Sequence, residues 1–337
     1  MAQSLAMSQF DAALQAVETE EASPEEKAEM LMEIAMGMQL KPKSPEQLHQ
    51  AVELYERALA LCPWAAPLLG ARIRSRMGTA LQALPDGGTD ALYKARACYE
   101  EAGPVLEAKG KPEEAAELQM NLGLVLQSLT GHGVARITDA VQCYHRALRV
   151  FTRESHAQEF AILHNNLAIA YLSIPLTDER ARMREALAVQ SFEEVLKVIN
   201  LVDHPTEYAM IQNNLGNALQ YAASGHPLEN NLRALDAYDE ALKVRNERDT
   251  PLEYANTLCN KANVLRNLPD DPLVAATDRN LDRAAALYEK ALALFLQARQ
   301  TGSAAMVEET LVEISRERAA ALPRPNGRDD GTLHTPT

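Results

Sequence analysis

Aromatic residues and long apolar runs are scarce in this chain of 337 residues. Phe, Trp and Tyr make up 5% of the sequence, with a single Trp. No stretch of 18 apolar residues occurs, so a membrane-spanning helix is not expected. Strand-like alternation of apolar and polar residues is also missing. A chain that is 47% hydrophobic, rich in alanine and poor in aromatics is typical of closely packed helices.

Basic residues are outnumbered as well. The 33 Lys and Arg face 47 Asp and Glu, which gives a net charge of −14. Because phosphate binding needs a basic stripe and none is present, no nucleic-acid partner is expected. The segment 1–10 has no basic residue and no long apolar run, so it does not resemble a signal peptide. We therefore expect a soluble cytoplasmic protein with no membrane insertion.

The residues of common catalytic and metal sites are few and scattered. The four Cys are far apart, which favours small core residues over a zinc or redox pair. None of the eight His lies in a His-x-x-x-His pairing. The loop 131–133 is not followed by the residues of a phosphate cradle, and no Gly-x-Ser-x-Gly elbow occurs. We expect a non-enzymatic protein without a metal or cofactor.

One pattern occurs six times, and the small residues that mark it lie 43 to 48 residues apart. Its first half contains a small residue: Ala35, Gly78, Gly123, Ala168, Gly216 and Ala262. Its second half contains a triplet at offsets of four and three, which places the three residues on one helical face. The triplets are Ala51/Tyr55/Ala58, Ala95/Tyr99/Ala102, Ala140/Tyr144/Ala147, Ala188/Phe192/Val195, Ala234/Tyr238/Ala241 and Ala284/Tyr288/Ala291. Such a period is typical of helical solenoids, which mostly bind other molecules.

Each unit is expected to hold two antiparallel helices, because Pro and Gly separate its halves. The predicted first helices are 25–39, 66–84, 112–129, 156–173, 205–223 and 251–268. The predicted second helices are 45–62, 90–109, 135–154, 180–202, 229–248 and 274–300. Capping boxes are predicted at the pairs Ser23/Glu26, Ser44/Gln47, Ser155/Gln158 and Thr250/Glu253.

The chain is thus expected to have four parts. They are an N-terminal helical arm at 1–22, six repeats at 23–300, a capping helix at 301–322 and a disordered tail at 323–337. The predicted repeats are 23–63, 64–110, 111–155, 156–203, 204–249 and 250–300. Apolar contacts are expected from Leu5, Phe10, Leu14 and Val17 in the arm, and from Met306, Leu311, Ile314 and Leu322 near the C-terminus.

This pattern resembles the tetratricopeptide repeat, with its small residue in the first helix and its Ala-aromatic-Ala triplet in the second. The units are longer than the usual ~34 residues. They are similar to the elongated variant of kinesin light chains and bacterial scaffold proteins, most clearly at 163–171 and 211–219. The resemblance covers about residues 25–300. It implies an all-α, right-handed α-solenoid with capping helices, in which first helices line a concave groove and second helices form the outer wall.

The resemblance also implies which side chains face that groove. The residue two before the small one is asparagine in units three to six: Asn121, Asn166, Asn214 and Asn260. Further candidates are Asn165, Asn213, Asn217, Gln220, Asn256, Asn263, Arg266 and Asn267. Asparagine costs a helix roughly 0.6 kcal/mol relative to alanine, so its repetition asks for a reason. Its amide both donates and accepts, so the series either clamps a partner's backbone or links neighbouring helices internally.

Four other residues stand out. Arg72 and Arg76 lie four apart on one predicted helix. They are either solvated charges or an anchor for an acidic side chain or a terminal carboxylate. Trp64 is expected to pack between the first two repeats, and an exposed Trp there would instead be a binding hot spot. Lys261 occupies a core-like position and is expected to extend outward.

These features favour an adaptor or scaffold that binds a peptide or helix of a protein partner in the groove. Two alternatives remain open. One is an assembly or maturation chaperone that holds an enzyme subunit and then releases it. The other is a structural protein that self-associates into a homo-oligomer through its second helices.

Overall fold

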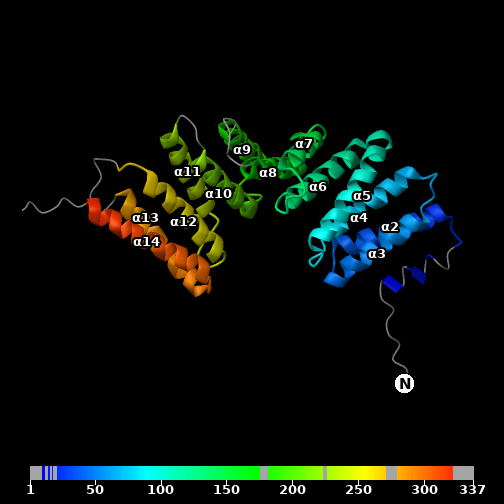
Figure 1. Ribbon diagram of the computed structural model, residues 1–337, viewed down its shortest axis with the longest axis horizontal. Coiled ribbons are helices and arrows are strands. Elements are labelled where there is room, and N and C mark those ends of the chain that lie inside the picture. Colours follow the sequence, from blue (N-terminus) through cyan, green and yellow to red (C-terminus); the bar gives the residue numbers. More distant parts are fainter. Residues whose placement is uncertain are drawn as a thin grey trace, which may run out of the picture. The chain divides into compact units, whose positions relative to one another are not determined.

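The computed structural model describes residues 21–174, 181–222, 226–270 and 279–321, together with Phe10, Asp11, Leu14, Gln15 and Val17. Within these ranges every regular element is an α-helix (Figure 1). None of the described helices is both long enough and apolar enough to cross a membrane. The predictions for Leu5, Leu322 and the tail at 323–337 concern residues outside the described ranges. The all-α prediction is confirmed.

The helices alternate as expected. The first helices of the six repeats are α2 (Pro24–Leu40), α4 (Pro67–Gln82), α6 (Pro112–Thr130), α8 (Ala157–Ser173), α10 (Pro205–Tyr221) and α12 (Pro251–Asn267). The second helices are α3 (Pro45–Leu61), α5 (Gly88–Lys109), α7 (Ile137–Ala147), α9 (Ala181–Val195), α11 (Pro227–Leu242) and α13 (Asn280–Gln297). A final helix, α14, spans Thr301–Ala321.

The chain forms two compact units, Met1–Val198 and Ile199–Thr337. In the first unit, each first helix packs on its own second helix, and the first helices α2, α4, α6 and α8 contact one another in turn. In the second unit, α10 pairs with α11 and α12 with α13, while α10 also contacts α12. Within each unit, successive first helices therefore lie side by side.

The repeated triplet forms the core of every helix pair. Tyr55, Tyr99, Tyr144 and Tyr238 are fully buried, and Phe192 and Tyr288 nearly so. The tyrosine rings lie directly on the small residue of the first helix. A Cβ atom added at Gly123 would lie 2.4 Å from Tyr144 Cε1, and one at Gly216 would lie 2.6 Å from Tyr238 Cε1. Close approach of the two backbones therefore requires glycine there.

Both ends of the repeat array are covered by further apolar side chains. Val17 is buried against α2 and α3, and Phe10 and Leu14 pack on the same cluster, as predicted for the arm. At the other end, α14 buries Ala304, Val307 and Ile314 on α13. Leu311 packs there too, whereas Met306 is 71% exposed, so its predicted inward position is wrong. The helix presents Val307 at that turn instead.

Only one of the predicted capping boxes forms. Ser23 Oγ accepts from the Glu26 amide, and Glu26 Oε2 accepts from the Ser23 amide at 2.8 Å. The boxes predicted at Ser44, Ser155 and Thr250 are wrong, because none of these side chains caps a helix. Thr250 Oγ1, for example, accepts from the Asn246 amide of the preceding turn.

Three second helices end about six or seven residues earlier than predicted, at Ala147, Val195 and Leu242. In two of the turns that follow, an asparagine side chain binds the backbone. Asn200 Oδ1 accepts from the backbone amides of Val202 and Asp203. Asn246 Oδ1 accepts in the same way from the backbone amides of Arg248 and Asp249. Such local bonds compete with helix continuation, and the Asn-x-x-Asp pattern is a signal that the sequence analysis missed.

Trp64 does not pack between the first two repeats. Its side chain is 95% exposed in the loop between α3 and α4. That loop is held by other residues: Ala66 is buried, and Cys62 lies against it with Sγ 3.6 Å from the Ala66 carbonyl. The helices close without the indole, so the predicted packing is wrong and the exposed alternative holds.

The glycine–tyrosine contact makes a prediction about two glycines of the first unit. Gly123→Ala should lower the free energy of unfolding by about 1–3 kcal/mol, because the buried Tyr144 ring has no space to move. Gly37→Ala should instead raise it by about 0.5–1 kcal/mol, because nothing lies within 4 Å of an added Cβ in this helix. Chemical denaturation of both variants measures the difference, and equal effects would contradict the packing described.

Candidate functional site

The candidate site is the first-helix face, defined here as the side of the first helices that carries the predicted binding residues. Asn121 on α6 and Asn214 on α10 are half-buried there, and Asn166 on α8 is 8% exposed. Asn256 on α12 is exposed. Asn121 and Asn166 belong to the first compact unit, and Asn214 and Asn256 to the second. Each unit therefore presents its own portion of the face.

Arg72 and Arg76 on α4 point to the neighbouring first helix. Arg72 Nε donates to Glu114 Oε1 at 2.7 Å, and Arg76 Nη1 donates to Glu117 Oε1 at 3.0 Å, both on α6. The hydrogen bond from Arg72 holds the pKa of the Glu114 carboxyl below its usual value. The protein thus supplies its own acidic partners, which the sequence analysis missed. A role for these arginines as an anchor for a partner stays a prediction.

In the second unit, an amide pair joins two first helices. Asn260 Nδ2 on α12 donates to Asn213 Oδ1 on α10 at 3.2 Å. The buried Thr257 hydroxyl lies 3.3 Å from the same oxygen, but its one proton has a closer acceptor in the Glu253 carbonyl at 2.8 Å. Asn213 is 9% exposed, so its carbonyl is satisfied internally. This is the amide ladder between helices that the sequence left open as one of two interpretations.

Other predicted amides bind the buried tyrosines. Tyr238 OH donates to Asn217 Oδ1 at 2.7 Å and lies 3.3 Å from Gln220 Oε1. Tyr288 OH donates to Asn263 Oδ1. These three amides therefore have a role inside the protein, and their predicted contact with a partner remains untested.

Glutamine recurs for the same reason four residues after the small residue. Gln39, Gln82, Gln127 and Gln220 each contact the tyrosine hydroxyl of their own repeat. In the fourth repeat the aromatic residue is Phe192, which has no hydroxyl, and the corresponding position is Leu172. The chain thus places an amide where a buried hydroxyl needs one.

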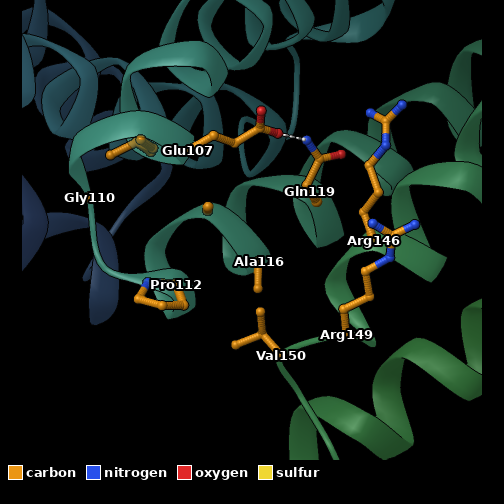
Figure 2. A pocket seen from close by; sticks show the side chains of 10 residues that line it. Glu107, Gly110, Pro112, Ala116, Gln119, Arg146, Arg149 and Val150 are labelled. Atoms are coloured by element: carbon orange, nitrogen blue, oxygen red, sulfur yellow. Dashed lines mark hydrogen bonds between the residues drawn. The ribbon is translucent and has the colours of Figure 1, made fainter.

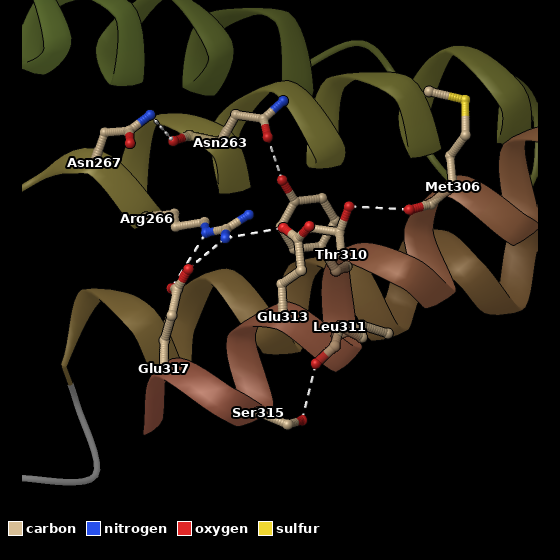
Figure 3. Close-up of polar contacts among 10 residues, drawn as sticks. Asn263, Arg266, Asn267, Met306, Thr310, Leu311, Glu313, Ser315 and Glu317 are labelled. Carbon is tan, nitrogen blue, oxygen red and sulfur yellow. Dashed lines mark hydrogen bonds and ion pairs between the residues drawn. The ribbon is translucent and has the colours of Figure 1, made fainter. Parts of the chain in front are cut away.

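Arg266 is tied to the last helix (Figure 3). Its guanidinium pairs with Glu313 at 3.0 Å and with Glu317, both on α14. Asn267 Nδ2 donates to the carbonyl of Asn263 at 2.9 Å. Lys261 is 16% exposed and pairs with Asp239 on α11, in agreement with its predicted outward reach. These contacts join α12 to α11 and α14 at the end of the second unit.

Asn166 differs from these residues. Its Nδ2 is buried and has no hydrogen-bond partner among the described residues, and the neighbouring Asn165 Oδ1 and His164 Nδ1 are in the same state. Burial lowers the pKa of His164, which favours the neutral ring. Three consecutive residues of α8 thus hold unused polar atoms.

The described residues contain no group of three or more His, Cys, Asp and Glu arranged to hold a metal. The four cysteines are free thiols. Burial raises the pKa of Cys98 and Cys143 to about 11 and that of Cys259 to about 12. These thiols are therefore protonated at neutral pH and poor nucleophiles.

Comparison with known proteins finds no matching family model and no matching curated protein. Among solved structures, the chain is similar to a signal transduction ATPase with numerous domains (STAND) from Pyrococcus horikoshii that carries a tetratricopeptide repeat sensor. The TM-score is 0.50 at 14% identity, over 92% of this chain and 48% of that one. The chain thus spans about half the length of that protein.

Two other solved structures are similar over most of this chain. One is NprR in complex with its cognate peptide NprX, with a TM-score of 0.47, 14% identity, and coverage of 92% of this chain and 77% of that one. The other is a Rap protein complexed with competence and sporulation factor. Its TM-score is 0.31 at 12% identity, over 93% of this chain and 98% of that one. Of the three, the STAND protein reaches a TM-score of 0.50, and at 14% identity that likeness shows the fold alone, which is an α-solenoid. The kinesin-light-chain-like variant stays a prediction.

The tyrosine–glutamine pairs predict a double-mutant result. Gln127→Leu should cost about 1–3 kcal/mol of unfolding free energy, because it leaves the buried Tyr144 hydroxyl unpaired. Adding Tyr144→Phe should recover most of the loss, because it recreates the Phe192/Leu172 combination of repeat four. Denaturation of the two single variants and the double variant measures the coupling. Additive losses would contradict the role assigned to the pair.

The Arg72–Glu114 pair predicts a pH dependence. Because the folded pKa of Glu114 is lowered, the pair stabilises fully above the ordinary carboxyl pKa and loses its effect as pH falls through the folded value. Arg72→Gln should therefore lower the melting temperature at pH 7, and the difference from wild type should shrink below about pH 4. Arg182→Gln, an exposed arginine of α9, serves as control. A difference that persists unchanged at low pH would refute the assignment.

Proposed function

We propose that this chain is a non-catalytic adaptor that binds a segment of a partner polypeptide along the first-helix face. The buried, unpartnered amide nitrogen of Asn166 carries this proposal. A buried donor without an acceptor costs about 1–3 kcal/mol, and a bound partner carbonyl would remove that cost. The neighbouring acceptor, Asn165 Oδ1, would meet a backbone N–H. Together they match the two polar groups of a peptide bond.

A comparison with the second unit explains why Asn166 Nδ2 has no hydrogen-bond acceptor. Asn260, at the same place in repeat six, donates to Asn213 of the preceding first helix. In the repeat before Asn166, the position that corresponds to Asn213 is Met120, whose thioether is a weak acceptor. The chain thus repeats the donor but omits its internal acceptor in the first unit. This distinction between two asparagines at the same position supports binding at α8.

The position of α8 also favours binding of an extended partner segment that contacts several first helices. The first helices α4, α6 and α8 contact one another in turn, so a bound segment can meet more than one of them. Backbone-directed amides bind a polypeptide with little dependence on its side chains, while Asn121 and exposed residues of α6 add specificity. Because Asn166 Nδ2 and Asn165 Oδ1 are buried, the adaptor is proposed to bind after the side chains that cover these two atoms move aside.

The proposal predicts the behaviour of a triple variant, Asn166→Ala, Asn214→Ala and Asn260→Ala. Affinity capture from native lysate with cross-linking should recover about tenfold less partner. Helicity should stay the same or rise, because alanine is the better helix former. The apolar core of the second unit includes neither Asn214 nor Asn260, so this unit should remain folded.

The matched control removes three exposed amides from second helices, as Gln142→Ala, Gln190→Ala and Gln297→Ala. It should capture the partner like the wild type. Equal capture by the asparagine variant, or an equal loss in the control, would rule out binding through the first-helix face.

A further inference from the structure

A pocket in the first unit lies away from the residues of the first-helix face. It has a volume of about 590 Å³ and is bounded by the end of α5, the first half of α6, and the end of α7 with the turn after it. Figure 2 shows Gln119 between Glu107 on one side and Arg146 and Arg149 on the other. We call it the Gln119 pocket.

Gln119 is held in one orientation and has an unused acceptor. Its Nε2 donates to Glu107 Oε1 at 3.1 Å, which fixes the amide because a flipped amide would set oxygen against the carboxylate. The side chain is 7% exposed, and its Oε1 has no hydrogen-bond partner among the described residues. That oxygen points to the side from which the two arginines rise (Figure 2). The pocket therefore requires an N–H or O–H donor.

The two arginines also lack a partner that other repeats supply. Arg146 directly precedes the last residue of the triplet, and the corresponding residues of repeats two, four and five are Glu101, Glu194 and Glu240. In repeat two, Glu101 pairs with Arg74 at 2.9 Å, and Arg74 occupies the position of Gln119. Relative to repeat two, repeat three has arginine in place of the carboxylate and an amide in place of the arginine. Repeats one and six are also basic at the position of Arg146, but there Arg57 pairs with Glu53 and Lys290 with Glu247.

Arg149 keeps the basic charge of its counterparts but lacks their glutamate partner. In repeats four and five the corresponding residue is a lysine, Lys197 or Lys243, and each pairs with the glutamate three residues before it. Arg149 instead follows Arg146 at that spacing, and neither guanidinium forms an ion pair with the described carboxylates. Two guanidinium groups thus line the pocket without an ion pair to the described carboxylates.

The remaining wall is apolar. Leu106 and Ala116 are 2% and 3% exposed, and Val150 is half-buried beside them. An apolar group of four or five carbons has room in a pocket of this volume. The pocket thus combines two arginines that have no carboxylate partner among the described residues, the free acceptor Gln119 Oε1, and an apolar wall.

We propose that the Gln119 pocket binds an N-acylated apolar amino acid, the chemistry also found in the last residue of a polypeptide chain. Its carboxylate lies between Arg146 and Arg149, its amide N–H donates to Gln119 Oε1, and its side chain lies on Leu106 and Val150. Arginine suits this role because its planar donors match a carboxylate. The proposal does not depend on the first-helix face, so either can fail alone.

The test uses N-acetyl-leucine as probe in ligand-observed NMR with the full chain. Binding in about the millimolar range is expected for so small a ligand. N-acetyl-leucinamide lacks the carboxylate and 4-methylpentanoate lacks the N–H, so each should bind at least tenfold more weakly. The peptide acetyl-Ala-Ala-Leu compares a chain terminus with the free acylated amino acid: tighter binding by the peptide identifies a polypeptide source.

Two variants and one control locate the site. Arg146→Glu copies the residue of repeats two, four and five, so it should fold normally and lose at least tenfold in affinity. Gln119→Leu should show a similar loss. Arg182→Glu makes the same charge change on an exposed residue of α9 and should bind like the wild type. The proposal is overturned if Arg146→Glu binds normally, if the leucinamide binds as well as the acid, or if inorganic phosphate displaces the probe at equal concentration.

Discussion

The contact between the aromatic residue of each second helix and the small residue of each first helix determines the rest of the structure. It brings the two backbones so close that three repeats require glycine, and it buries a tyrosine hydroxyl in five of the six repeats. That hydroxyl then needs an acceptor or donor, which Gln39, Gln82, Gln127 and the amides of the last two repeats provide. Close packing thus explains the small residues, and the hydrogen bonds of the buried hydroxyls explain many of the amides that recur from repeat to repeat.

Fixed packing also fixes the rotation of each first helix. Side chains of each first helix are therefore brought next to the neighbouring first helix. Arg72 and Arg76 of α4 form ion pairs with Glu114 and Glu117 of α6, and Asn260 of α12 forms an amide pair with Asn213 of α10. Each of these positions either finds a partner inside the protein or remains open. Asn166 and Gln119 are the open cases, and both arise where the sequence of a repeat departs from that of its neighbours.

Much of this architecture follows from the sequence, because the offsets of four and three place Ala51, Tyr55 and Ala58 on one face whatever surrounds them. The sequence does not determine whether the asparagines bind a partner or another residue of the protein, for a physical reason. An amide such as Asn217 is equally suited to a buried hydroxyl and to a partner, and the choice depends on a contact with a residue 21 positions away. Helix ends at Ala147 and Val195, and the exposure of Trp64, depend similarly on loop geometry that periodicity does not encode. The Gln119 pocket emerges only when the repeats are superposed position by position.

The account makes Asn166 the residue through which the first unit meets its partner. Its side-chain amide signal in the NMR spectrum tests this most directly, with the Asn260 signal as internal reference because that amide already has an acceptor. On addition of the captured partner, the Asn166 Nδ2 resonance should shift and its hydrogen exchange should slow, while the Asn260 signal stays unchanged. A complex that forms with the Asn166 signal unaltered would contradict the account.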